Sequence, residues 1–266
     1  MSEPLFSVRH LSKSYPSFID NEPFHALCDI NLDIFEGQCL MLAGSNGSGK
    51  TLLMRIVCGL LEPSAGEVFF KGLPLFNAKR SERHAAERLL RGAAGLVFQD
   101  ADSQIVGETV REDAAFGPEN LGFDKEKTAA LVTQALSEMG LMEKQNSIAR
   151  RLSGGEKRRL AIAGVLAMGC SIVIMDEPFA NLDWPGIVST LKVICNLKKT
   201  GRTLVILSHE LEKALALADR LVIIHRGRLC ADGVPEEVLD RLDPAWGVRD
   251  PRRNYAKVKD CTWLKE

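Results

Sequence analysis

The sequence predicts an α/β fold with a mixed β-sheet and a nucleotide-phosphate site, because of three features. Apolar strand patterns alternate with helix patterns along most of the 266 residues, as expected for strands and helices packed in layers. A stretch with the spacing Gly-x-x-x-x-Gly-Lys-Thr occupies residues 44–51. A short apolar strand at 172–175 is followed at once by two carboxylates, Asp176 and Glu177.

The composition is that of an ordinary globular protein, with 45% hydrophobic and 26% charged residues. The formal net charge of −1 gives no overall attraction for nucleic acid, so no nucleic-acid partner is expected. The seven cysteines form no C-x-x-C pair, and we interpret them as small buried residues in a reducing compartment. No secretory signal or bilayer-spanning run is expected, so a membrane role requires a partner.

The first elements are strands that lead into the glycine-rich stretch. Residues 27–34 alternate strictly between apolar and polar side chains, which predicts a half-buried antiparallel strand. Residues 38–43 form a short apolar strand, and residues 51–61 have a helix pattern that begins at the glycine-rich stretch. Further strands are predicted at 66–71 and 95–98.

A helical subdomain is predicted from about residue 100 to 151, where apolar residues recur at helical spacing in polar surroundings. One amphipathic face contains Leu131, Ala135, Leu136 and Met139. The apolar run that begins at Leu160 is interpreted as a helix ending near Gly169, followed by the buried strand at 172–175.

The central sheet is predicted to resume after this strand. Strands are expected at 203–207 and 220–225, and helices at 185–199 and 210–218. We assign residues 1–242 to one domain. Residues 243–266 form a polar tail, which carries Arg249, Arg252, Arg253, Lys257, Lys259, Trp246 and Trp263.

The stretch at 44–51 is predicted to hold the phosphates of a nucleoside triphosphate. Its glycines allow successive backbone N–H groups to point at phosphate oxygens, Lys50 adds a positive charge, and the Thr51 hydroxyl can ligate Mg²⁺. The alternative is a glycine-rich turn that happens to precede a helix. The predicted phosphate contacts come from Gly44, Ser45, Asn46, Gly47, Ser48, Gly49, Lys50 and Thr51.

The segment Ser153–Gly154–Gly155–Glu156 allows two interpretations. Ser-x-x-Glu is a capping box, which would do no more than satisfy the first N–H groups of the next helix. Two weak helix formers, Gly154 and Gly155, indicate instead that a ligand approaches the backbone. Three cations at 157–159 would also be disfavoured by the helix dipole, and a nearby polyphosphate would reverse that effect.

Asp176 and Glu177 are expected at the carboxyl end of a strand, where α/β sheets bind ligands. A solvated acidic pair is the alternative. With a phosphate site in the same chain, we predict that Asp176 holds Mg²⁺, directly or through water, and that Glu177 polarises the attacking water.

The order of these three motifs closely resembles that of the ATP-binding cassette (ABC) ATPases. The resemblance covers residues from about 6 to 238 and implies a P-loop NTPase core with an antiparallel β subdomain and an inserted helical subdomain. It also implies that ATP and Mg²⁺ are bound between two cassettes, identical or paralogous, arranged head to tail. Ser153 and its neighbours through Glu156 would then contact ATP held by the opposite subunit.

The resemblance implies roles for further residues. His209 would contact the γ-phosphate, and Gln99 would sense Mg²⁺ and the attacking water. Tyr15 would stack on adenine, the alternative being an aromatic residue of the core at the edge of a strand. Asn181-Leu182-Asp183 is similar to the loop that crosses between the cassettes, although the family usually has Ala or Gly at the position of Asn181.

Residues 97–120 resemble the corresponding region of energy-coupling-factor transporters, which import vitamins, cobalt or nickel. Gln104 and the run Asp113-Ala-Ala-Phe-Gly-Pro-Glu-Asn120 carry this resemblance. It implies an ATPase subunit at the cytoplasmic face of the membrane, bound to transmembrane subunits and without contact to the transported substrate. We expect a groove beside Gln99 to receive a helix of that partner, with apolar contacts from Ile105, Val106, Val110 and Phe116. The alternative is that these side chains simply fill the small core of the helical subdomain.

Two alternatives remain at this stage. A soluble cassette ATPase of DNA repair or translation usually has two cassettes or a long coiled coil, and this chain shows neither. A P-loop kinase would leave residues 153–156 and His209 without a role.

Overall fold

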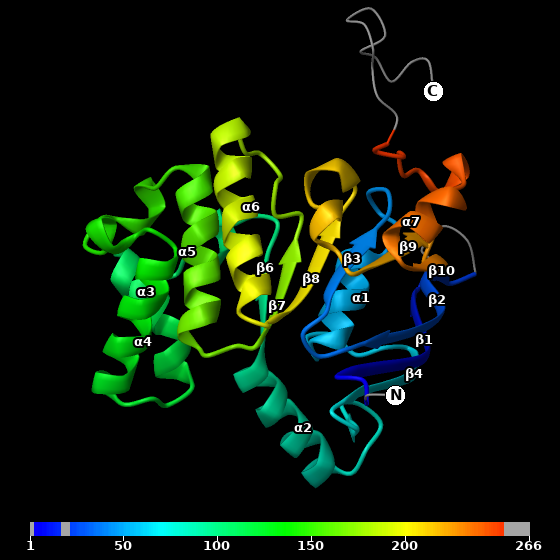
Figure 1. Cartoon of the computed structure of the whole chain (residues 1–266). Helices are drawn as coiled ribbons and strands as arrows, with labels where there is room; N and C mark the ends of the chain where they lie inside the picture. Colours follow the sequence, from blue (N-terminus) through cyan, green and yellow to red (C-terminus); the bar gives the residue numbers. More distant parts are fainter. Residues whose placement is uncertain (1–2, 17–21, 253–266) are drawn as a thin grey trace, which may run out of the picture.

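The computed structural model describes residues 3–16 and 22–252 and contains two β-sheets with helices packed around them (Figure 1). The smaller sheet has the strand order β2-β1-β4-β5 and the larger one the order β10-β9-β3-β8-β7-β6. The predicted tail residues Arg253, Lys257, Lys259 and Trp263 lie outside the described residues, as does Cys261.

The larger sheet is mixed, as predicted. Five strands are parallel, and β10 pairs antiparallel with β9 at one edge. The strands are β3 (Cys39–Ala43), β6 (Ala94–Val97), β7 (Ile172–Asp176), β8 (Thr203–Ser208), β9 (Arg220–His225) and β10 (Arg228–Gly233). The carboxyl ends of β3, β7 and β8 therefore meet at one edge of the sheet. The glycine-rich stretch, the pair Asp176 and Glu177, and His209 all lie at this edge.

The smaller sheet is antiparallel, which confirms the strand predicted at 27–34. Its members are β1 (Phe6–Tyr15), β2 (Phe24–Ile34), β4 (Ala65–Phe70) and β5 (Leu73–Pro74). Its buried side chains pack on α1 (Lys50–Val57) and on one face of the larger sheet. Helix α1 ends at Val57, earlier than predicted, because Gly59 adopts a left-handed conformation with φ 70°.

Strand β7 shows how the core is divided between the two faces of the larger sheet. All five of its residues are buried. Ile172 and Ile174 pack with the cluster around α1, whereas Val173 and Met175 pack with α5 (Gly154–Ala167) and α6 (Trp184–Lys199). This strand buries side chains on both faces and therefore reads as a continuous apolar run.

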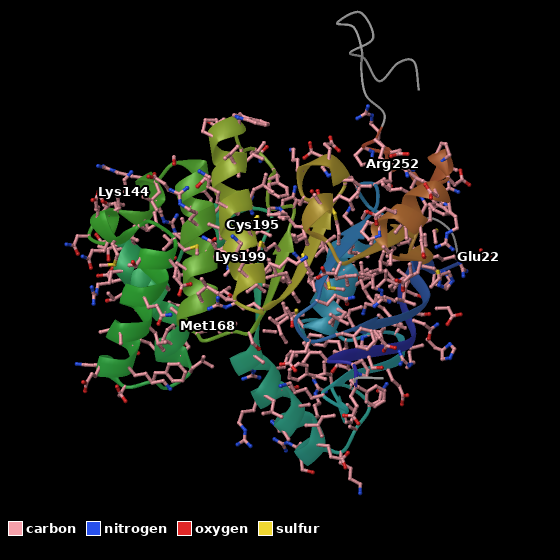
Figure 2. All side chains as sticks on the ribbon, viewed as in Figure 1. Glu22, Lys144, Met168, Cys195, Lys199 and Arg252 are labelled. Carbon is pink, nitrogen blue, oxygen red and sulfur yellow. The ribbon has the colours of Figure 1, made fainter. Side chains whose placement is uncertain are left out.

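The helical subdomain consists of α3 (Val110–Asn120) and α4 (Lys125–Glu138) packed on α5, on the side of the molecule opposite the antiparallel sheet (Figure 1). Ala135, Leu136 and Met139 are buried as predicted, and Leu131 is half-buried. Met168 lies at the end of α5 (Figure 2). It packs closely on Gly117 of α3, where a Cβ atom would lie 2.5 Å from the Met168 Cγ atom.

The predicted helix at 210–218 is wrong. The segment forms two short 3₁₀ helices, η4 (Leu211–Lys213) and η5 (Leu215–Leu217). The break between them lets Leu211 and Ala214 enter two different core clusters. The remaining helices are α2 (Arg80–Ala93), η1 (Asp102–Gln104), η2 (Met142–Lys144), η3 (Ala149–Arg151), α7 (Pro235–Asp240) and η6 (Pro244–Trp246).

The segment that follows α7 packs on the core as far as it is described. Val248 is buried in the same cluster as Met41 and Leu221. The domain boundary at residue 242 stays a prediction. Among the described residues, no helix has the length and apolarity needed to cross a bilayer.

Candidate nucleotide site

The glycine-rich loop lies between β3 and α1, as its proposed chemistry requires. Gly44 has no room for a side chain, because a Cβ atom there would lie 2.2 Å from the Ile224 backbone oxygen. Gly49 immediately precedes α1 with φ 109°, a conformation that other residues rarely adopt. The local fold thus depends on glycine at both positions.

A cavity of about 440 Å³ opens over this loop. Residues from four parts of the chain line it: Phe24, Ala26, Asn46, Gly47, Ser48, Gly49, Lys50, Thr51, Leu52, Gln99, Asp176 and Glu177. The structure therefore brings the predicted phosphate loop, the acidic pair and Gln99 to one place.

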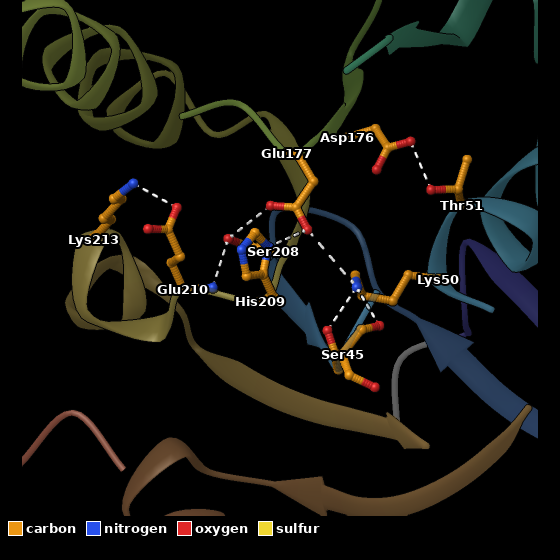
Figure 3. A network of polar contacts seen from close by, with 10 residues as sticks. Ser45, Lys50, Thr51, Asp176, Glu177, Ser208, His209, Glu210 and Lys213 are labelled. Atoms are coloured by element: carbon orange, nitrogen blue, oxygen red, sulfur yellow. Dashed lines mark hydrogen bonds and ion pairs between the residues drawn. The ribbon is translucent and has the colours of Figure 1, made fainter. Parts of the chain in front are cut away.

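Lys50 bonds to its own loop (Figure 3). The ammonium donates to the Gly44 carbonyl at 2.6 Å and to the Ser45 carbonyl at 3.2 Å. It also lies 3.8 Å from Glu177 Oε1. Burial lowers the pKa of Lys50, whereas the nearby Glu177 and Asp176 oppose that shift.

Asp176 faces the start of α1 across the cavity. Its Oδ2 atom accepts a 2.7 Å hydrogen bond from the Thr51 hydroxyl (Figure 3), and its Oδ1 atom is buried without a hydrogen-bond partner. Burial raises the pKa of this carboxyl, although the Thr51 hydrogen bond partly opposes the shift. An orphaned carboxylate oxygen beside a hydroxyl fits a cation, which would satisfy it.

The residues that are present favour Mg²⁺ held jointly with phosphate rather than a metal site made of protein alone. No group of three His, Cys, Asp or Glu side chains in the described part of the chain could hold a metal. Mg²⁺ in phosphate-binding sites commonly has one or two protein oxygens, with water and phosphate as its other ligands. Thr51 and Asp176 supply such a pair.

Glu177 is almost fully buried and is tied to β8. Its backbone N–H donates to the Leu207 carbonyl at 2.9 Å, and its φ of 46° is in the left-handed region. The carboxylate contacts the Ser208 hydroxyl at 3.2 Å and the His209 ring nitrogen Nδ1 at 2.9 Å (Figure 3). Glu177 and His209, for which separate roles were predicted, are therefore in direct contact.

The segment at 153–156 forms a complete capping box at the start of α5. The Ser153 hydroxyl accepts from the Glu156 N–H, and the Glu156 carboxylate accepts from the Ser153 N–H at 2.9 Å. A hydrogen-bonded ion pair with Lys144 is the main cause that lowers the pKa of Glu156 to about 2. The chain itself does not crowd the glycines, since a Cβ atom at Gly154 or Gly155 would meet nothing closer than 3.7 Å.

The cations at 157–159 all have partners within the chain, and a polyphosphate near them stays a prediction. Lys157 pairs with Asp102, and Arg159 donates to the Ser189 hydroxyl. Arg158 is buried and donates to the Phe98 and Gln99 carbonyls at 2.6 and 2.8 Å. Burial lowers the pKa of Arg158. The two Arg158 hydrogen bonds join α5 to the end of β6.

The capping-box segment does not reach the cavity over the phosphate loop. None of residues 153–156 is among the described residues that line that cavity. Gly154 instead lines a second cavity of about 250 Å³, together with Gln99, Asn181 and Leu182. Asn181 has φ 59°, a left-handed conformation that asparagine tolerates better than most residues. This conformation gives a reason for asparagine at position 181, where the resemblance leads one to expect Ala or Gly.

Tyr15, the predicted adenine contact, is not among the residues that line the cavity over the loop. Its cross-strand neighbour Phe24 is, and that side chain is 64% exposed. Two residues opposite one another in an antiparallel pair project to the same face. Sequence reasoning missed Phe24 and also Ser208, and the only signal for Ser208 was its place at a strand end next to His209.

The residues predicted to line a partner groove divide into two groups. Ile105 and Val110 are buried in the core of the helical subdomain, so they cannot be exposed anchors as they stand. Val106 and Phe116 are 56% and 52% exposed. Gln104 bonds back to β6, accepting from the Phe98 N–H and donating to the Leu96 carbonyl, so it closes its own loop.

Comparisons with known proteins all point to one family. Residues 27–180 match the family described as ABC transporter. The energy-coupling factor transporter ATP-binding protein EcfA of Methanocaldococcus jannaschii is 38% identical over 214 residues, covering 80% of this chain and 75% of the relative. The cobalt import ATP-binding protein CbiO of Rhodobacter capsulatus is 36% identical over 249 residues, covering 93% of this chain and 85% of the relative.

A solved structure agrees with these relatives. It is cbiO1 from Clostridium perfringens, described as part of the ABC transporter complex cbiONQ. It is 31% identical with a TM-score of 0.77, and the match covers 90% of this chain and 92% of that one. The chain spans about half the length of some other relatives, 53% of one and 56% of another.

These matches confirm the predicted fold class and the resemblance to the energy-coupling-factor group. The motifs that carried the resemblance occupy the ends of β3, β7 and β8 and the start of α5. Because the family model spans more than half of the sequence and the relatives cover most of it, the chain belongs to the ABC transporter family.

Proposed function

We propose that this cassette is the ATP-hydrolysing subunit of an importer of the energy-coupling-factor type. It drives uptake of a metal ion or a vitamin through transmembrane subunits, from the cytoplasmic face of the membrane. The observation that carries the proposal is the cavity over the phosphate loop, because it joins Lys50, Asp176 and Glu177. The names of the relatives point to the transporter class.

ATP binding follows from the loop and its neighbours. The N–H groups at 45–51 and the Lys50 ammonium bind the phosphates. Thr51, and Asp176 with its unpartnered Oδ1 atom, are the residues that would hold Mg²⁺. The bound ion supplies charge neutralisation for the phosphates. Gln99 lines the same cavity and lies where it can sense the ion and the water.

Hydrolysis depends on Glu177. Its carboxylate lies at the end of a buried strand, 3.8 Å from the Lys50 ammonium and within reach of His209. A carboxylate in this place orients a water molecule and accepts its proton, a contribution of about 10²- to 10⁴-fold in rate. His209 reaches the γ-phosphate from the adjacent strand end.

A second cassette completes the site. Residues 153–156 do not line the cavity of their own chain, yet the chain itself leaves space above Gly154 and Gly155. We infer that this surface covers ATP bound to a second cassette, identical or paralogous. Loss of the γ-phosphate then removes contacts that stabilise the closed pair.

The membrane partner docks on the segment that follows Gln99 in the chain, where Val106 and Phe116 are exposed. Because Ile105 is buried, Val106 replaces it as the first position for a test. Cysteine placed at Val106 should crosslink to a helix of the transmembrane subunit, with a yield that differs between ATP-bound and ATP-free complexes.

The test uses proteoliposomes that hold the chain with the transmembrane subunits that copurify with it. Wild type should hydrolyse ATP and take up the transported substrate, and Glu177→Gln should lose both activities while the complex remains assembled. Recovery of the active chain without any transmembrane subunit would favour a soluble cassette ATPase. Uptake that continues in the Glu177→Gln complex would remove Glu177 from the reaction.

A further inference from the structure

Ser208 is a fully buried hydroxyl at the point where two functional strands meet. It ends β8 and is 0% exposed. Strand β8 lies between β3, which leads into the phosphate loop, and β7, which leads to Glu177. A hydroxyl at such a depth needs hydrogen-bond partners.

The two partners of Ser208 fix the direction of its hydrogen bonds. The Glu210 backbone N–H lies 3.1 Å from the Ser208 Oγ atom, and an N–H group can only donate. The hydroxyl hydrogen is therefore available for the second partner, the Glu177 Oε2 atom at 3.2 Å. Ser208 thus donates to the carboxylate (Figure 3).

The two oxygens of Glu177 are held by different kinds of partner. Oε1 contacts the Lys50 ammonium and the His209 ring, the two groups expected to turn to the phosphates when ATP binds. Oε2 contacts Ser208, which belongs to the sheet and has no exposed surface. Of these three contacts of the Glu177 carboxylate, only the one with Ser208 involves a group that is not expected to bind the nucleotide.

The backbone conformation of Glu177 requires contacts that hold the residue in place. Its φ of 46° is costly for a residue with a side chain and persists only where the surroundings hold it. The Leu207 carbonyl holds the Glu177 N–H at 2.9 Å, and Ser208 holds the side chain. Leu207 and Ser208, adjacent residues of β8, therefore hold the backbone and the side chain of Glu177, respectively.

We propose that Ser208 is the positioning residue that keeps the Glu177 carboxylate in place when ATP has drawn Lys50 and His209 away. With Oε2 bound to Ser208, the Oε1 atom faces the attacking water. The inference rests on the role proposed for Glu177. Removal of the Ser208 hydroxyl is expected to slow the reaction rather than weaken ATP binding, because Ser208 does not line the cavity itself and reaches it only through Glu177.

The experiment compares hydroxyl removal at the two ends of the same strand. Ser208→Ala removes the proposed positioning contact. Thr203→Val is the matched control, because Thr203 is buried at the other end of β8 and its hydroxyl accepts from the Gly37 N–H at 2.9 Å. Both are measured in the assembled complex for kcat, KM for ATP and melting temperature.

Ser208→Ala is expected to lower kcat by about 10- to 100-fold, since a small displacement of a reacting group has effects of this size. KM should stay within about twofold, and Ser208→Thr, which keeps a hydroxyl, should recover most of kcat. Thr203→Val should leave kcat unchanged even if the melting temperature falls. In a Glu177→Gln background, Ser208→Ala should cause no further loss.

Three results would overturn the proposal: kcat of Ser208→Ala within twofold of wild type, an equal loss of kcat in Thr203→Val, or a full additional loss in the Glu177→Gln background. Glu177→Gln alone separates this proposal from the function on which it rests. If that variant turns over like wild type, the role of Glu177 fails. If it is inactive while Ser208→Ala is fully active, only the positioning role fails.

Discussion

Two neighbouring carboxylates, Asp176 and Glu177, have different surroundings and hence different chemistry. Asp176 bonds through one oxygen to the Thr51 hydroxyl and has the other oxygen unpartnered. Glu177 turns toward β8 and Lys50. The left-handed backbone of Glu177 separates the two side chains. In a continuous strand, successive side chains also point to opposite faces. Here the chain leaves the strand at Glu177, and its carboxylate bonds to Ser208.

The different surroundings of Asp176 and Glu177 predict different effects when each carboxylate is replaced by its amide. Glu177→Gln should retain ATP binding and stall hydrolysis, and the ATP-bound pair should accumulate on size-exclusion chromatography. Asp176→Asn should weaken binding of Mg²⁺-ATP itself, because it removes a charge from the metal-side oxygens. ATP titration with and without Mg²⁺ measures the second effect, and identical behaviour of both variants would contradict the division of roles.

Phe24 offers a second test at the residue scale. Because Phe24 lines the cavity, Phe24→Ala should weaken ATP binding by about 1–3 kcal/mol, the usual contribution of base stacking. Inorganic tripolyphosphate has no base, so its affinity should not change. Titration of both ligands checks this, with Tyr15→Ala in parallel. An equal loss for both ligands would show that Phe24 supports the loop rather than the base.

At the scale of elements, the close approach of α5 to β6 joins the helical subdomain to the central sheet. Gly95 of β6 faces Val165 of α5, and a Cβ atom there would lie 2.3 Å from the Val165 Cγ1 atom. Arg158 of α5 adds its two hydrogen bonds to the strand end. The position of Gln99 is thereby tied to the helix that Ser153 caps.

Gly95→Ala should therefore lower the free energy of unfolding by about 1–3 kcal/mol, as overpacking commonly does. Gly92→Ala is the matched control, because Gly92 is exposed near the end of α2 with nothing within 4 Å of a new Cβ atom. That change should be neutral or raise stability by about 0.5–1 kcal/mol. Urea unfolding of both variants measures the difference, and equal stabilities would contradict the close packing.

The elements show where sequence reasoning succeeds. Strands β3 and β7 are continuous apolar runs beside glycines or carboxylates, so their positions followed from pattern alone. Helix α2 was missed because only Ala86 and Leu90 are buried along it, which leaves a very thin apolar stripe. Its exposed face carries ion pairs such as Arg83 with Glu87.

The site shows the limit of the same reasoning. The motif residues were identified because their chemistry is local to a few positions. Phe24 reaches the cavity through pairing with Tyr15, and Arg158 holds carbonyls 59 and 60 residues earlier in the chain. Such contacts depend on strand register and helix packing, which a single sequence does not specify.

At the scale of the whole molecule, the phosphate loop and the capping-box segment line separate cavities. A pair of chains arranged head to tail would then have two composite sites. Each site would combine the loop of one chain with the Ser153 segment of the other.

Mixed dimers test this arrangement. Lys50→Ala removes the phosphate charge of one chain, and Ser153→Arg blocks the segment of its partner. In the mixed pair one composite site carries both changes and the other carries neither, so ATPase activity should partly return. Each homodimer should be inactive. Mixed dimers that form but stay inactive would mean that the sites are not shared in this simple way or that both are required.

The Lys50 ammonium braces the phosphate loop, since it donates hydrogen bonds to the carbonyls of Gly44 and Ser45. The loop is therefore preorganised, and nucleotide binding exchanges one set of partners for another instead of ordering a slack segment. Backbone amides of the loop should be protected from hydrogen exchange even without ATP. In Lys50→Ala that protection should fall, so this variant loses the frame of the anion site together with its charge.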